Sequence, residues 1–225
     1  MTRRRLDAEL VRRGLVSSRE QGRAAIEGGR VSISGVTATK AATQVDDAAA
    51  IELVAEPGSD FVSRGAHKLI GALDAFGLDV RDANALDAGA STGGFTQVLL
   101  QRGARHVIAV DVGYGQLAWS LRSDDRVTVL ERTNVRHLDA SRDELPFPPD
   151  LVVADLSFIS LTAVLPALVT VAAPTANLVL MVKPQFEVGK ERVGSGVVTS
   201  PELRREAVAR GATAAEAEQL APLGV

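Results

Sequence analysis

A glycine-rich turn between a short apolar strand and a helix limits the possible folds of this chain more than any other feature. Asp87 closes the strand, and Asp111 closes the next apolar run along the chain. The turn after Asp87 contains Gly89, Gly93 and Gly94. Glycine lets a ligand approach the backbone because it has no Cβ, and an acid that ends the second strand can bind a ribose diol. The pattern predicts a nucleoside-cofactor site in a Rossmann-like sheet, although an ordinary tight strand-to-helix turn would use the same glycines.

Apolar strands and amphipathic helices alternate from residue 65 onward, which predicts an α/β fold. The predicted strands are 84–87, 106–111, 126–130, 150–155 and 176–183, and the predicted helices are 66–76, 94–102, 115–122, 160–172 and 201–220. The last four strands are apolar runs of the kind found in the interior of a parallel sheet. Such a sheet is doubly wound, and its ligand crevice lies at the carboxyl ends of the strands.

The first 55 residues form a different pattern, that of a small α+β unit. Residues 1–40 hold nine Lys or Arg against four acids, although the whole chain has a net charge of −3. A basic segment on an acidic body indicates an anionic partner. We expect an N-terminal domain over residues 1–58, a linker over 59–64 and the α/β domain over 65–225.

Several classes of protein are disfavoured by composition. The chain has no cysteine, which excludes disulfides and thiolate metal sites, and its three histidines share no metal-ligand spacing. No apolar run reaches the ~18 residues of a membrane-spanning helix, and the charged N-terminus does not resemble a signal peptide. We therefore expect a cytoplasmic protein that uses neither a metal nor a membrane.

Three charged residues stand where they could perform chemistry. Asp155 and Lys183 each close an apolar strand, and Lys68 lies on the first helix of the α/β domain. Opposite charges side by side offset the cost of partial burial. A lysine becomes a base when its neutral form is favoured by desolvation or by a second lysine, so this set could accept the proton of a ribose hydroxyl. A purely structural ion pair would show the same residues.

The N-terminal unit resembles the S4 RNA-binding domain. The resemblance is carried by Arg5-Leu-Asp7, Gly14-Leu15, Ser18-Arg19, Val31-Ser-Ile33 and Gly35. It implies binding to folded RNA through phosphates and shape. The candidate RNA-binding residues are Arg3, Arg4, Arg5, Arg12, Arg19 and Arg23, which could instead be the solvated faces of two helices.

The whole chain from about Arg3 to about Ala209 resembles the TlyA family. The matching motifs are Ser63-Arg-Gly-Ala-His-Lys-Leu69, Asp87-Ala-Gly-Ala-Ser-Thr-Gly-Gly-Phe95, Asp111-Val-Gly-Tyr-Gly-Gln-Leu117, Glu131-Arg-Thr-Asn134, Asp155-Leu-Ser-Phe-Ile-Ser160 and Lys183-Pro-Gln-Phe-Glu-Val-Gly-Lys190. Members of this family pair an S4 domain with an FtsJ-like methyltransferase domain and methylate the cytidine 2′-hydroxyl of ribosomal RNA. The resemblance implies S-adenosylmethionine (SAM) as cofactor, and ribosomal RNA or ribosomal subunits as partner.

The resemblance also implies roles for particular residues. Lys183 is expected to accept the 2′-hydroxyl proton, Asp155 to hold it in place, and Lys68 to favour the neutral form of Lys183. The expected cofactor-binding residues are Asp87, Gly89, Ser91, Gly93, Gly94, Phe95, Asp111 and Asn134.

A fourth catalytic residue of the family, a glutamate in a C-terminal strand pair, has no match within residues 1–225. We therefore expect weak turnover from this sequence as it stands, with Glu187 as a possible substitute. A non-catalytic RNA-binding protein is the alternative function. The family is also labelled haemolysin, but no membrane-active segment supports a pore-forming role.

Overall fold

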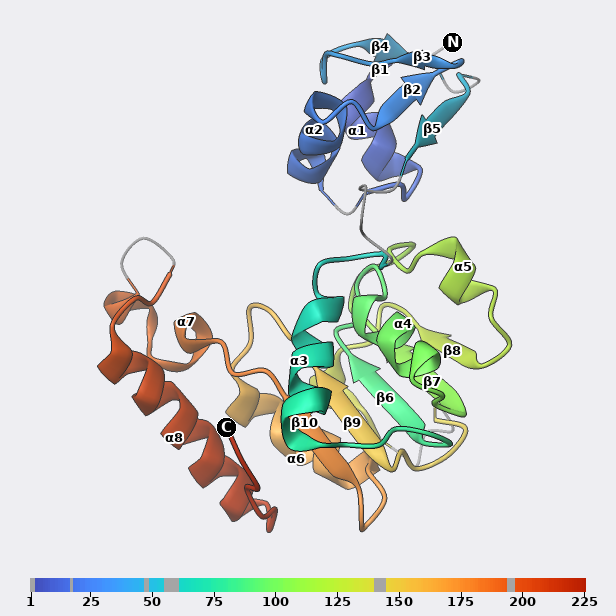
Figure 1. Ribbon diagram of the computed structural model, residues 1–225. Coiled ribbons are helices and arrows are strands. Elements are labelled where there is room, and N and C mark those ends of the chain that lie inside the picture. The colour runs from blue at the N-terminus through green and yellow to red at the C-terminus, as the bar shows by residue number, and fades with distance from the viewer. Residues whose placement is uncertain (1–2, 17, 47–48, 55–60, 140–144, 194–196) are drawn as a thin grey trace.

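The computed structural model describes residues 3–16, 18–46, 49–54, 61–139, 145–193 and 197–225. Two units follow one another along the chain, a small N-terminal one and a larger C-terminal one (Figure 1). The larger unit is built on a parallel five-stranded sheet, which confirms the predicted α/β class.

The N-terminal unit packs two helices against short strands. The helices are α1 (Leu6–Arg12) and α2 (Arg19–Glu27), and the strands are β1 (Arg4–Arg5), β2 (Val31–Ile33), β3 (Val36–Thr37), β4 (Gln44–Val45) and β5 (Ile51–Leu53). Ser18 caps α2 by accepting a hydrogen bond from the amide of Gln21. Leu6, Leu10 and Ile26 form the centre of a small separate core. This unit therefore has its own apolar interior, as expected for a domain.

The C-terminal unit contains five parallel strands in the order β10-β9-β6-β7-β8. Their bounds are β6 (Asn84–Ala88), β7 (His106–Val110), β8 (Val127–Leu130), β9 (Leu151–Ala154) and β10 (Asn177–Leu180). The helices are α3 (Ala66–Phe76), α4 (Gly94–Gln101), α5 (Trp119–Arg122), α6 (Leu161–Val171), α7 (Pro184–Glu187) and α8 (Pro201–Ala217), with short 3-10 turns at Val135–His137 and Lys190–Arg192.

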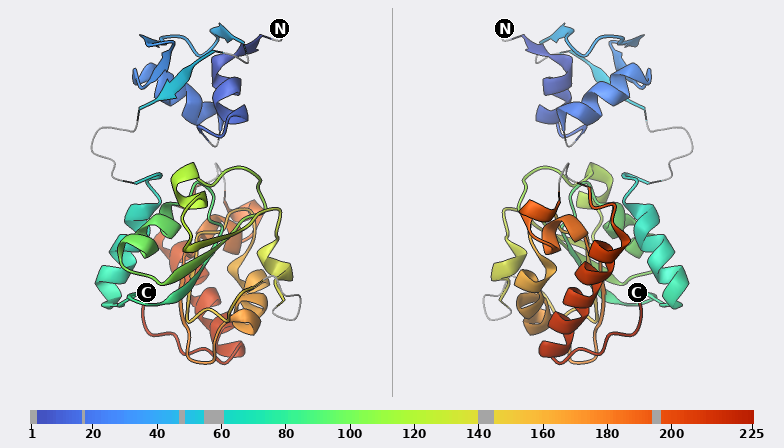
Figure 2. Two further views of the ribbon diagram at one scale, coloured as in Figure 1. Left: turned by 90° about the vertical axis from the view of Figure 1, so that its right-hand side faces the viewer. Right: turned by 90° about the vertical axis from the view of Figure 1, so that its left-hand side faces the viewer.

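Helices cover both faces of this sheet, with α3 and α4 on one side and α6 and α8 on the other (Figures 1 and 2). Successive strand residues point to opposite faces. In β6, Ala85 joins the apolar cluster that includes α3 and α4, whereas Leu86 joins the cluster that includes α6. The strands are apolar on both faces for this reason, and the central strands are buried apart from the first residues of β6 and β7.

The structure corrects three predictions about the sheet and its helices. β8 and β10 are edge strands, not interior ones, because an apolar run does not reveal how many neighbours a strand has. The predicted strand 176–183 ends at Leu180. The predicted helix 115–122 is shortened to Trp119–Arg122, because the preceding segment is a loop with Gly115 at a positive φ of 68°.

Candidate active site

Lys68, Asp155 and Lys183 lie together at the carboxyl end of the sheet. β9 and β10 pair in parallel with Ala154 opposite Leu180, so the segments that follow them leave the sheet side by side. Asp155 Oδ2 lies 2.9 Å from Lys68 Nζ, and Asp155 Oδ1 lies 2.6 Å from Lys183 Nζ. Lys68 reaches this point from the first turn of α3. The structure thus brings all three predicted catalytic residues together around one carboxylate.

The charge state of Asp155 follows from these contacts. Burial raises the pKa of Asp155, but hydrogen bonds and charge from Lys183 and Lys68 outweigh burial, so that its pKa lies below the usual value. The carboxylate is therefore ionised near neutral pH and serves as an anchor for the two lysines.

The loop after Asp155 contributes two residues that the sequence reasoning did not single out. Ser157 Oγ accepts a hydrogen bond of 2.8 Å from Lys183 Nζ. Phe158 has a positive φ of 65°, which is rare for a bulky residue, and its side chain is 92% exposed. Its ring lies 5.6 Å from that of Phe186. An exposed aromatic ring therefore stands within three residues of the charged cluster.

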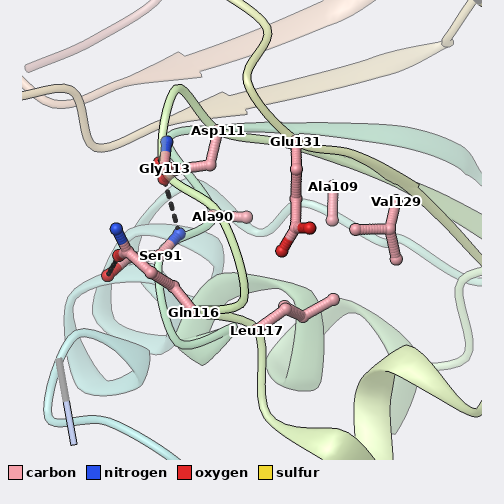
Figure 3. Close-up of a pocket in the computed structure, with 9 residues that line it drawn as sticks. All are labelled: Ala90, Ser91, Ala109, Asp111, Gly113, Gln116, Leu117, Val129 and Glu131. Atoms are coloured by element: carbon pink, nitrogen blue, oxygen red, sulfur yellow. Dashed lines mark hydrogen bonds between the residues drawn. The ribbon is translucent and has the colours of Figure 1, made fainter. Parts of the chain in front are cut away.

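A cleft opens beside the glycine turn, with the side chains of Asp111 and Glu131 on one side and those of Gln116 and Leu117 on the other (Figure 3). Its remaining lining residues are Ala90, Ser91, Ala109, Gly113 and Val129. Asp111 Oδ2 accepts the amide of Ser91 at 2.8 Å, and Oδ1 accepts the amide of Gly113 at 2.7 Å. Asp111 thereby fixes two loops, while each of its oxygens keeps a second lone pair for a ligand.

Glu131 also lines the cleft, although no role was predicted for it from the sequence. It follows β8 directly, accepts the amide of Gly115 at 2.7 Å, and forms an ion pair with Arg122. Glu131 could have been predicted as a site residue, because it directly follows an apolar strand, as Asp111 does. Together the two acids give the cleft two carboxylates from neighbouring strands.

Asp87 is fully buried beneath the glycine turn. Thr96 Oγ1 donates a hydrogen bond of 2.7 Å to Asp87 Oδ2, but Oδ1 has no partner among the residues that the structure describes. Burial raises the pKa of Asp87 to about 7, with smaller contributions from the charges of Asp155 and Asp111. A buried carboxylate oxygen without a partner is costly, and a cationic group of a ligand would satisfy it.

Protein neighbours explain the glycines of the turn. Gly89 and Gly93 have positive φ angles of 87° and 99°. A Cβ added to Gly93 would lie 2.3 Å from Leu121 Cδ1, and one added to Gly94 would lie 2.2 Å from Ser63 Oγ. These positions thus require glycine for packing, before any ligand is considered.

Six of the eight predicted cofactor residues lie outside the cleft lining. Phe95 is buried in the core with α3 and α4. Asn134 is exposed, and its side chain caps the 3-10 turn Val135–His137 by accepting the amide of Arg136. Asp87, Gly89, Gly93 and Gly94 surround the turn rather than line the open cleft. Ser91 and Asp111 are the predicted cofactor residues that line it.

Glu187 is held at the start of α6. Its carboxylate accepts hydrogen bonds from Ser160 Oγ at 2.6 Å and from the amide of Leu161 at 2.7 Å. Both of its oxygens are engaged in joining α7 to α6, and no contact places it on Asp155 or the two lysines within the described ranges. Its observed contacts are structural.

The six predicted RNA-binding arginines divide by their contacts. Arg5 and Arg19 bind Asp7, and Arg12 binds Glu9. Arg4 lies 4.0 Å from Glu9, while Arg3 and Arg23 are exposed. The structure thus places several of the basic side chains on acids that are buried in α1.

Within the part of the chain that the structure describes, no three His, Cys, Asp or Glu residues gather into a possible metal site. Over the same residues, no helix has the length and apolar character that crossing a membrane requires.

Two family models match the chain. The model for FtsJ-like methyltransferases matches residues 61–219, and the model for the S4 domain matches residues 4–51. The first match spans most of the C-terminal unit and includes both the charged cluster and the cleft.

The chain is also similar to named relatives. It is 59% identical to the 16S/23S rRNA (cytidine-2′-O)-methyltransferase TlyA of Mycobacterium tuberculosis, over 92% of this chain and 76% of that protein. It is 36% identical to Hemolysin A of Brachyspira hyodysenteriae, over 92% of this chain and 85% of that protein. A solved structure with a hemolysin label from Streptococcus thermophilus superimposes with a TM-score of 0.73 at 39% identity, covering 97% of this chain and 79% of the other.

Proposed function

Because the chain belongs to the TlyA branch of the FtsJ-like methyltransferase family, we propose that it transfers a methyl group from SAM to the 2′-hydroxyl of a cytidine in ribosomal RNA. The observation that carries this proposal is the convergence of two lysines on Asp155, next to a cleft with two acids. We place this activity with the ribosomes, in the cytoplasm.

The cleft residues fit SAM chemically. Asp111 and Glu131 offer carboxylate acceptors for ribose hydroxyls and for an adenine amino group, and Leu117 and Val129 offer apolar contact. The unpartnered Oδ1 of Asp87 suits the cationic methionine end. When bound, SAM supplies an electrophilic methyl group on a sulfonium. Such a transfer needs alignment and a nucleophile that loses its proton, and it needs no metal.

The three charged residues can perform the proton transfer. Lys183 is the proposed acceptor of the 2′-hydroxyl proton, and Lys68 is bound to the same carboxylate. Asp155 holds both amines within hydrogen-bond distance, 2.6 and 2.9 Å from its oxygens. Ser157, bonded to Lys183, further limits the directions in which that amine can turn.

An RNA substrate agrees with the surface near this cluster. The exposed ring of Phe158 offers a face on which an unpaired base can stack. The basic arginines of the N-terminal unit supply contacts to phosphates, which give affinity without reading sequence. Under this proposal the N-terminal unit holds the RNA while the C-terminal unit performs the transfer.

A methylation assay tests the proposed function. The chain is incubated with ribosomal RNA and SAM that carries a labelled methyl group, and 2′-O-methylcytidine is then mapped by nuclease digestion and mass spectrometry. We expect label on a cytidine ribose, and none when Lys183 is replaced by alanine. RNA binding without any methyl transfer would contradict the proposal and support a non-catalytic RNA-binding role.

A further inference from the structure

Two buried carboxylates in α1 collect arginines from several parts of the N-terminal unit. The side chains of Asp7 and Glu9 are 0% and 1% exposed, whereas most of their arginine partners reach solvent. A buried charge is tolerated only when it is well paired. The pairs are Arg5 and Arg19 on Asp7, and Arg12 and Arg13 on Glu9.

The two arginines on Asp7 converge on a single atom. Arg5 Nη2 and Arg19 Nη2 each donate to Asp7 Oδ2 at 3.0 Å, and Arg5 Nε donates to Oδ1 at 3.0 Å. The two Nη2 atoms therefore cannot lie farther apart than twice that distance. The side chains of Arg5 and Arg19 remain 41% and 58% exposed. Two like charges are thus held close together and open to solvent.

Asp7 itself is fixed by the fold. Its Oδ1 accepts the amide of Ala8 at 2.9 Å, and its own amide donates to the carbonyl oxygen of Ala41. The hydrogen bond from Arg5 is the largest influence on Asp7 and lowers its pKa to about 2, against the opposing effect of burial, with further help from Arg19. The carboxylate therefore stays charged wherever the protein is folded and active.

Arg13, one of the two arginines on Glu9, uses its N–H groups within the N-terminal unit. Arg13 is only 21% exposed, and its guanidinium also donates to the carbonyl oxygen of Ala49 at 2.8 Å. Those donors are used inside the unit. By contrast, no second partner of Arg5 or Arg19 is found among the residues that the structure describes, and both side chains reach solvent.

We propose that Asp7 is a positioning residue for RNA recognition, which presents Arg5 and Arg19 together as a preformed clamp for one phosphate of a folded RNA. A guanidinium binds phosphate through paired N–H groups in a fixed geometry, and two of them held by one carboxylate need little reordering on binding. The inference rests on the proposed function, because it assumes that the N-terminal unit meets ribosomal RNA.

One substitution separates the proposal from a simple effect of charge, because the two predict opposite changes in the affinity for folded RNA. Asp7→Asn removes a negative charge and keeps the shape of the side chain. If the arginines acted only as mobile charges, RNA would bind more tightly. If Asp7 positions them, folded RNA binds more weakly, while an unstructured polyanion that needs no fixed geometry binds at least as well as before.

The experiment measures the affinity of the full chain and of Asp7→Asn for a folded ribosomal RNA fragment and for poly(U) of equal length. We expect about tenfold weaker binding of the folded RNA, with unchanged or tighter binding of poly(U). Folded-RNA affinity equal to or above that of the parent would overturn the inference, as would an equal loss on both RNAs.

Two further variants act as controls. Glu20→Gln removes one negative charge from an exposed side chain of α2, and thermal unfolding compares the stability of Asp7→Asn with that of the parent. An equal loss of folded-RNA affinity in Glu20→Gln would show that the loss does not depend on how Arg5 and Arg19 are held, and would overturn the proposal.

Arg19→Lys tests the clamp even if Asp7→Asn does not fold, because it keeps the charge and removes the paired N–H geometry. We expect severalfold weaker binding of folded RNA, and unchanged affinity would overturn the inference. A parent chain that does not bind ribosomal RNA at all would instead remove the proposed function, and the clamp with it.

Discussion

Asp111 joins the cleft to the sheet, because its two oxygens bind the amides of Ser91 and Gly113. We predict that Asp111→Ala weakens SAM binding about 10- to 100-fold, since a charge-assisted contact contributes on the order of 1.5–3 kcal/mol. Titration calorimetry measures this directly. The control is Asp79→Ala, which removes an exposed carboxylate whose ion-pair partner among the described residues is Arg81. Parent-like SAM affinity in a folded Asp111→Ala protein would refute the assignment.

Asp87 should make SAM binding depend on pH. Its pKa rises from 3.8 to about 7 in the folded chain, so between those values the folded protein holds a proton that the unfolded chain has lost. The free energy of unfolding of the ligand-free protein therefore falls as pH rises through this window. A cation beside Oδ1 favours the ionised carboxylate, so SAM affinity should rise by up to about tenfold per pH unit and level off above about 7.

The measurement is calorimetric SAM titration between pH 5.5 and 8, with Asp87→Asn as the matched variant. That variant should bind SAM more weakly and with a flat pH profile, because its amide does not ionise. A flat profile in the parent would show that Asp87 is already ionised or does not face the ligand.

At the residue scale, the sequence was most informative where charges end strands. Asp155, Lys183 and Asp111 could be placed at one edge of a sheet because parallel strands end together. The burial of Asp7 and the contacts of Arg5 and Arg19 could not be predicted. A sequence shows how many charges a segment carries, but the pairing of a helix residue with arginines on either side of it depends on the packed unit.

Helix α4 begins at a crowded point between the turn and α5. We predict that Gly93→Ala lowers the free energy of unfolding of the C-terminal unit by about 1–3 kcal/mol, because its φ is 99° and an added Cβ would lie 2.3 Å from Leu121 Cδ1. Urea unfolding followed by circular dichroism measures the change. Gly93→Ala should lower the free energy of unfolding by less in a Leu121→Ala background than in the parent, because the clash with Leu121 is then absent. Unchanged stability in Gly93→Ala would mean that the glycine is required only by the ligand.

Whether a segment forms a helix or a strand was easier to predict than where it ends or which strands lie beside it. Continuous apolar runs located strands β6 to β10, and period-3.6 patterns located helices α3, α4, α6 and α8, since both patterns reflect burial directly. The edge positions of β8 and β10 were missed, because strand order depends on contacts between distant parts of the chain. The shortened α5 was missed because Glu131, sixteen residues beyond Gly115, binds the amide of Gly115 and holds this segment as a loop.

At the scale of the whole molecule, the two units supply different parts of one reaction under the proposed function. The N-terminal unit provides positive charge with little chemistry of its own, and the C-terminal unit provides the cleft and the lysine–aspartate cluster. The sequence predicted this division because charge and residue periodicity both change between the two parts. The internal arrangement of each unit required the structure.

The decisive measurement is single-turnover methyl transfer to ribosomal RNA by the parent and by Lys183→Ala, with Asp79→Ala as control. We predict that Lys183→Ala slows transfer by about 100- to 10,000-fold, the usual contribution of a general base. Its SAM affinity should stay within a few-fold of the parent's, because such a group acts in the transition state more than in ground-state binding. A Lys183→Ala protein that transfers methyl groups at the parent rate would contradict the proposed role of Lys183 as proton acceptor.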